Sequence, residues 1–144
     1  MLSPLQYWIV LLIVSAYAFA RGRMDERSAA AICIAATVAT RLVHSPISDR
    51  FSDVEVGLLM VDLLTLAGFT AIALRSDRFW PLWVAGLQLT TIVAHLLKAI
   101  EVDLLPHAYA AAARFWVYPI FLIIIVGTWR SHQRRLSDSR AGAT

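Results

Sequence analysis

Residues 54–74 read VEVGLLMVDLLTLAGFTAIAL, a stretch whose only charged side chains are Glu55 and Asp62. About 20 mostly apolar residues are enough for a helix to cross the hydrocarbon core of a bilayer, which is roughly 30 Å thick. The whole chain has the same character, because 59% of its 144 residues are hydrophobic and only 16% are charged, with a mean hydropathy of +0.66. Soluble domains carry about a quarter charged residues. The sequence therefore predicts a single integral membrane domain.

Four further stretches have nearly the length and composition of a membrane span: residues 4–20, 28–45, 79–98 and 107–129. Together with 54–74 they predict an all-α fold of five transmembrane helices over residues 1–130, followed by a basic tail over 131–144. Ala18-Phe19-Ala20 resembles a signal-peptidase site, but residues 1–8 lack the basic segment that a signal peptide needs. We therefore expect the first helix to be retained.

The basic residues of the short connections predict the orientation, because arginine and lysine concentrate on the cytoplasmic side. With five spans, four basic residues fall on one side: Arg41, Arg50, Lys98 and Arg114. Nine fall on the other: Arg21, Arg23, Arg27, Arg75, Arg78, Arg130, Arg134, Arg135 and Arg140. The N-terminus is therefore expected outside and the C-terminus in the cytoplasm, in a multi-pass protein of the bacterial inner membrane. Because topology accounts for the basic residues, no nucleic-acid partner is expected.

Several ionisable residues inside the spans fall at matching depths. With a rise of about 1.5 Å per residue, Arg41, Asp62 and Thr91 each lie roughly 20 Å from the cytoplasmic end of their helices. His44 and His95 share a second level, about one turn nearer the outside. Intramembrane ionisable groups nearly always face the bundle interior or a wet cavity.

The polar residues also share helix faces, since steps of three and four residues return to the same side of a helix. The second, third and fourth spans each carry one such stripe. They predict a polar pocket open toward the outside and lined by Arg41, His44, Asp62, Gln88, Thr91, His95, Lys98 and Glu101.

Two pairs within this pocket have more than one interpretation. Arg41 and Asp62 form either an ion pair that holds two helices together or a working pair in gating or proton transfer. His44 and His95 are either hydrogen-bonded pocket residues or axial ligands of a b-type haem.

A zinc or copper site is a further alternative. It would combine the two histidines with His107 and an acid such as Glu101 or Asp103, although the spacing is not diagnostic. Cys33 is the only cysteine, so an intrachain disulfide, a zinc ribbon or an iron–sulfur cluster is excluded.

Three functions remain compatible with these residues. The first is a non-enzymatic accessory or assembly subunit of a larger membrane complex. The second is a homodimeric transporter or channel for protons or a small solute, which would use Arg41, Asp62 and His95. The third is an electron-transfer subunit that binds haem or quinone at His44 and His95. The sequence shows no constellation with catalytic spacing, so we favour a non-enzymatic protein whose partners are the lipid bilayer and other membrane subunits or a second copy of the chain.

Overall fold

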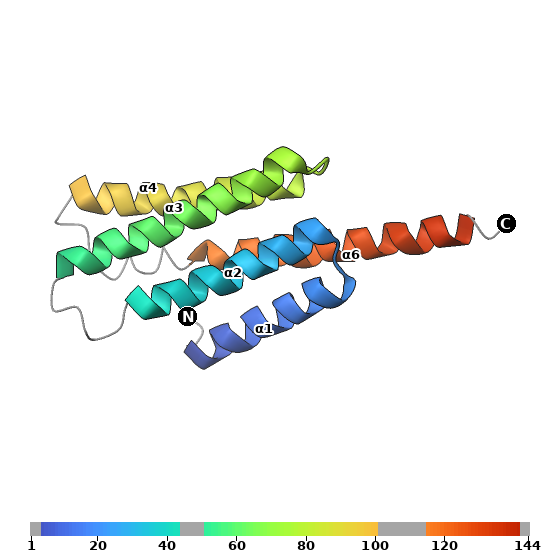
Figure 1. Cartoon of the computed structure of the whole chain (residues 1–144), viewed down its shortest axis with the longest axis horizontal. Helices are drawn as coiled ribbons and strands as arrows, with labels where there is room; N and C mark the ends of the chain where they lie inside the picture. Colours follow the sequence, from blue (N-terminus) through green and yellow to red (C-terminus); the bar gives the residue numbers. More distant parts are fainter. Residues whose placement is uncertain (1–3, 44–50, 101–114, 142–144) are drawn as a thin grey trace.

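The computed structural model describes residues 4–43, 51–100 and 115–141, and the side chains of all of these except 51–55 and 98–100. Within these residues the fold is entirely helical, without a strand. The helices are α1 (Pro4–Arg21), α2 (Met24–Val43), α3 (Phe51–Arg75), α4 (Trp80–Ile100) and α6 (Val117–Ala141) (Figure 1). The prediction of an all-α fold is therefore confirmed for the described part of the chain.

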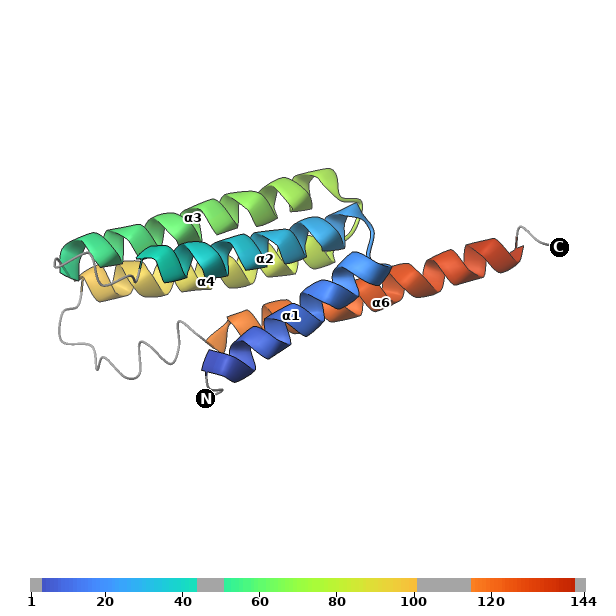
Figure 2. The ribbon, with the colours of Figure 1, turned by 60° about the horizontal axis from the view of Figure 1, so that its bottom comes forward.

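The helices pack lengthwise, and sequence neighbours run in opposite directions (Figure 1). Helix α2 packs against α1, α3 and α6, whereas α4 packs against α3 and α6. Contacts between α1 and α6 complete the bundle. The second half of α6 continues past the ends of the other helices (Figures 1 and 2).

The arginine-rich connections between helices lie at one end of the bundle. The α1–α2 and α3–α4 connections both lie at the end where α6 leaves the bundle (Figure 2). We call residues 21–27, 75–80 and 130–141 the basic end. It contains all nine arginines that the sequence places on the cytoplasmic side, because short connections between antiparallel helices bring alternate helix ends together.

The tightly packed core lies in the half of the bundle nearer this basic end. Its buried apolar side chains come from all five described helices: Leu11, Val14, Ala18, Ala29, Ala30, Cys33, Phe69, Val84, Ile120, Phe121 and Ile124. Helix α2 contributes only small residues to this core. Small side chains allow neighbouring helix backbones to approach closely, which suits a helix that packs against three others.

Three of the described helices are long and apolar enough to cross a membrane: α1, α3 over Val56–Arg75, and α4 over Trp80–Leu97. Large apolar side chains on these helices are exposed, among them Leu64 (70%) and Trp83 (70%). This is the composition of a membrane protein, because lipid rather than water would surround such side chains.

Helices α2 and α6 are not among these candidate spans. Helix α2 begins with Asp25, Glu26 and Arg27, and it carries Arg41 near its end. The apolar run of α6 ends at Trp129, and residues 107–114 of the predicted fifth span lie outside the described residues. The count of five spans thus stays a prediction. Residues 131–141 of the predicted tail continue α6 as helix.

Candidate functional site

The first polar cluster joins α3 to α4 through Asp62. The Oδ2 atom of Asp62 lies 2.9 Å from Nε2 of His95. Its Oδ1 atom accepts a hydrogen bond of 3.0 Å from the side-chain amide of Gln88. Gln88 and His95 are seven residues apart, which is two turns on one face of a helix. One carboxylate is therefore held by two side chains of the neighbouring helix.

This cluster lies in a partly buried seam between two candidate spans. The side chain of His95 is 17% exposed and that of Asp62 is 23% exposed. Gln88 and Thr91 on α4, and Thr65 on α3, are buried. The Thr65 hydroxyl donates to the Val61 carbonyl of its own helix, so it does not compete for the acid. The seam thus holds a carboxylate and an imidazole in contact between two candidate membrane spans.

The predicted ion pair between Arg41 and Asp62 does not form in this structure. Arg41 is exposed, and both carboxylate oxygens of Asp62 are bonded by α4 instead. The prediction rested on their matching depths, but depth along a helix says nothing about the direction in which a side chain leaves it. The Asp62 side chain is directed toward α4, so His95 and Gln88 are its partners.

The other predicted pocket residues cannot be placed. His44, Lys98 and Glu101 lie outside the described side chains, as do His107 and Asp103 of the alternative metal site. Within the described residues, no three histidine, cysteine, aspartate or glutamate side chains are grouped to hold a metal ion. Nε2 of His95 contacts a carboxylate, and because His44 lies outside the described residues, haem ligation by the two histidines stays a prediction.

The sequence analysis missed a second cluster, which is centred on Glu26 at the basic end. Its carboxylate is completely buried. Oε1 accepts hydrogen bonds from the Arg78 guanidinium at 3.0 Å and from the Ser131 hydroxyl at 2.6 Å. Arg78 also donates to Ser131. This network joins the start of α2, the α3–α4 connection and α6.

The same carboxylate helps to start α2. Oε2 of Glu26 accepts a 2.8 Å hydrogen bond from the backbone N–H of Arg23, the residue before the helix. A glutamate at the third helical position commonly reaches back in this way. Next to it, Asp25 accepts a 2.7 Å hydrogen bond from the Ser76 hydroxyl. The only feature of the sequence that could have indicated this cluster was the pair of acids, Asp25 and Glu26, in an otherwise basic connection. The burial of Glu26 depends on α6 packing over it.

A third cluster lies between the end of α1 and α6. The Arg21 guanidinium lies 2.7 Å from Nε2 of His132, and Arg135 donates to the backbone carbonyl of Arg21. These three side chains, with Ala20 and Leu136, line a pocket of about 380 Å³. We call it the α1–α6 pocket.

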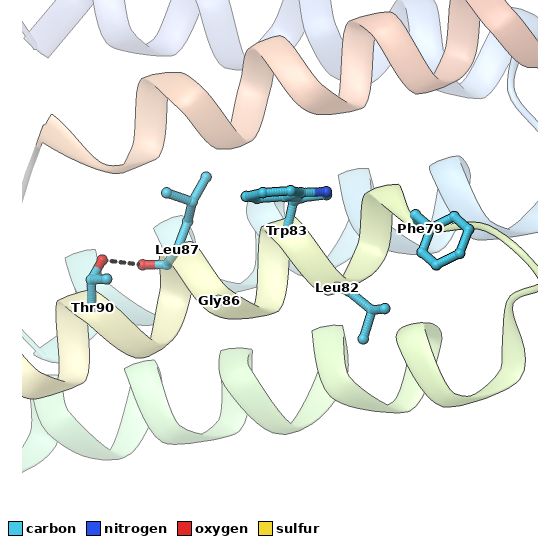
Figure 3. Close-up of a pocket in the computed structure, with 6 residues that line it drawn as sticks. All are labelled: Phe79, Leu82, Trp83, Gly86, Leu87 and Thr90. Atoms are coloured by element: carbon cyan, nitrogen blue, oxygen red, sulfur yellow. Dashed lines mark hydrogen bonds between the residues drawn. The ribbon is translucent and has the colours of Figure 1, made fainter.

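An open apolar groove runs along α4. Its volume is about 470 Å³, and it is lined by Phe79, Leu82, Trp83, Gly86, Leu87 and Thr90 (Figure 3). Gly86 leaves a gap in this row of larger side chains, since a Cβ atom placed there would meet no atom within 4 Å. The Thr90 hydroxyl donates to the Leu87 carbonyl of its own helix. The groove therefore offers an almost wholly apolar surface.

Comparison of the chain with protein-family profiles, with curated proteins and with solved structures found no match.

Proposed function

We propose that this chain is a multi-pass protein of the bacterial inner membrane, with five spans, its N-terminus outside and its C-terminus in the cytoplasm. Three helices are apolar enough to span, and α2 and α6 lie alongside them in the same bundle. The gathering of nine arginines at one end agrees with the rule that basic residues face the cytoplasm. The pairing of Glu26 with Arg78 offsets part of the cost of the charged start of α2.

Within this bundle, we propose that Asp62 and His95 hold and pass a proton, and that the protein moves protons or a proton-coupled small solute. The observation that carries the proposal is the 2.9 Å contact between Asp62 Oδ2 and His95 Nε2 on two candidate spans. Carboxylate and imidazole side chains form the proton relays of membrane pumps and transporters. Imidazole also changes its protonation state near neutral pH more readily than other side chains.

The role of Gln88 in this proposal is to position the acid. Its amide holds Oδ1 of Asp62, which leaves Oδ2 directed at the imidazole. Burying an ionisable pair costs desolvation free energy, and well-packed apolar residues join two helices equally well or better. A purely structural role therefore does not account for the pair. Five short helices rarely enclose a complete path, so the working unit is a homodimer or a larger assembly.

Purified protein reconstituted into vesicles that contain a pH-sensitive dye tests the proposal. Under an imposed potential, the native protein should admit protons, whereas Asp62→Asn and His95→Gln should each reduce the rate to that of empty vesicles. Asparagine at 62 keeps an oxygen for Gln88, so the helix contact survives. Asp25→Asn is the matched control, because it removes another hydrogen-bonded acid and should leave the flux unchanged. Native flux in Asp62→Asn would overturn the proposal.

A second candidate function is an accessory or assembly subunit, and the apolar groove on α4 favours it. Gly86 leaves space in which a helix of another membrane subunit could pack closely. Gly86→Leu should fill the groove without disturbing the bundle. If the protein is such a subunit, this variant should have native thermal stability but elute without its partner when it is solubilised in mild detergent. Retention of the native complex would remove this candidate.

A further inference from the structure

The α1–α6 pocket brings the Arg21 side chain together with two nitrogen-rich side chains of α6 that are 111 and 114 residues away in the sequence. Arg21 is the last residue of α1, whereas His132 and Arg135 lie in the second half of α6. The pocket has a polar wall formed by these residues and an apolar wall formed by Ala20 and Leu136. This combination suits a ligand that has both an anionic group and an apolar part.

The hydrogen bonds in the pocket hold the two arginine side chains in place and leave further N–H donors available. A guanidinium can only donate, so Nε2 of His132 accepts the bond from Arg21. Arg135 donates to the carbonyl of Arg21 at the end of α1, where a cation is favourable. Each guanidinium has five N–H donors. Donors therefore remain on both arginines for an anion, and their planar arrangement matches phosphate oxygens.

Among the described residues, no acidic side chain lines this pocket. Two described acids of the basic end are engaged elsewhere, since Glu26 is paired with Arg78 and Asp25 accepts a hydrogen bond from Ser76. Nine arginines stand against four acids in the segments of the basic end. Both guanidinium groups line one pocket and carry the same charge, so a bound anion would stabilise the arrangement.

The pocket also lies at the depth of the lipid headgroups, a point that rests on the proposed topology. Arg21 ends a candidate span. Arg135 lies six residues beyond Trp129, about 9 Å along the helix. The polar layer of each leaflet is roughly 5–8 Å thick. The arginines of the pocket therefore reach into or just beyond this layer, with Ala20 on the hydrocarbon side.

We propose that the α1–α6 pocket binds the phosphate group of an anionic phospholipid of the cytoplasmic leaflet. Arg21 and Arg135 contact the phosphate oxygens, Ala20 contacts the glycerol and the first acyl carbons on the hydrocarbon side, and Leu136 lies beside the headgroup. Bound lipid joins the end of α1 to α6.

Native mass spectrometry of the detergent-solubilised protein, titrated with phosphatidylglycerol or phosphatidylcholine, tests this proposal. Neutral detergent removes the general attraction of a charged bilayer, so it reports on the pocket alone. The native protein should retain one phosphatidylglycerol at concentrations where phosphatidylcholine does not bind. Arg21→Gln/Arg135→Gln should weaken phosphatidylglycerol binding at least about tenfold, since each lost charge-assisted bond is worth about that factor.

Arg134→Gln/Arg140→Gln is the matched control. It removes the same charge from the same end of the protein, but neither residue lines the pocket, so binding should change less than about threefold. Circular dichroism establishes whether both variants are folded. If Arg21→Gln/Arg135→Gln is not folded, Arg21→Lys/Arg135→Lys takes its place, and because it keeps the charge it should bind with intermediate strength. Equal losses in pocket and control variants would overturn the proposal. Displacement of the lipid by millimolar inorganic phosphate or glycerol phosphate would also overturn it, because the ligand would then be a soluble phosphate.

Discussion

Glu26, whose carboxylate is buried, should be the residue of the basic end on which the free energy of unfolding depends most. It accepts hydrogen bonds from Arg78, Ser131 and the Arg23 backbone, at 3.0, 2.6 and 2.8 Å. Glu26→Ala removes all three and leaves Arg78 without its counter-charge. Breaking a buried ion pair on one side costs about 3–5 kcal/mol. We expect the lower part of this range, because the Arg78 side chain is 18% exposed and can recruit water.

Two further variants separate the contribution of the hydrogen bonds from that of the unpaired charge on Arg78. Glutamine has one oxygen in place of two, so Glu26→Gln loses at least one charge-assisted hydrogen bond and should cost about 1.5–3 kcal/mol. The double variant Glu26→Ala/Arg78→Ala no longer strands a charge. It should therefore be more stable than the sum of the single variants predicts, by an interaction energy of about 1–3 kcal/mol. Asp25→Ala is the control, since it removes one hydrogen bond with Ser76 and should cost about 1 kcal/mol.

The measurement is equilibrium unfolding in mixed micelles, with a rising mole fraction of dodecyl sulfate and circular dichroism as the readout. Tryptophan fluorescence, to which Trp80 beside Gly127 contributes, gives a second signal. If Glu26→Ala unfolds with the native midpoint, or costs no more than Asp25→Ala, the network does not hold the three segments together. Simple additivity of the double variant would equally refute the reasoning.

Three other predictions concern helix packing and orientation. Gly22→Ala should destabilise the protein by about 1–3 kcal/mol, because its Cβ would lie 2.4 Å from the Ala18 carbonyl oxygen, whereas Gly86→Ala should unfold within about 0.5 kcal/mol of the native protein. Tyr7→Phe should cost about 1 kcal/mol in the same titration, since the phenol is bonded at 2.9 Å to Thr37 across the α1–α2 contact, and Tyr7→Phe should have almost no effect in a Thr37→Val background. A green fluorescent protein fused to the C-terminus should fluoresce and an alkaline phosphatase fused there should be inactive, whereas the reverse would contradict the proposed orientation.

The sequence alone predicted that Gln88 and His95, which both contact Asp62, share one face of α4. Helix geometry is periodic, so the spacing of Gln88 and His95 determines that they share a face, and a constant rise per residue determines their depth. These local rules place both residues on the polar stripe of the fourth span. The same rules place Asp62 level with Thr91 and about one turn from His95, and in the structure Asp62 contacts both Gln88 and His95.

The partner of Asp62 was not predictable in the same way. Arg41 matches Asp62 in depth as well as any residue of α4, yet it is exposed and does not contact it. Which neighbour a side chain meets depends on how each helix is rotated about its own axis within the bundle. That rotation is set by the packing of all five described helices together, which the spacing along one helix does not contain.

Glu26 shows most clearly which features follow from the local sequence and which depend on tertiary packing. Its sequence neighbours, MDER, mark the charged start of a helix, and this much follows from local chemistry: an acid in the first turn accepts hydrogen bonds from free backbone N–H groups. Its complete burial, and its bonds to Arg78 and Ser131, depend on residues 52 and 105 positions away. The sequence by itself determined a helical, membrane-type chain with one basic end, because hydrophobicity, helix periodicity and the charge of short connections act locally. Only the tertiary structure decided which polar groups meet, because those contacts depend on how distant helices pack side by side.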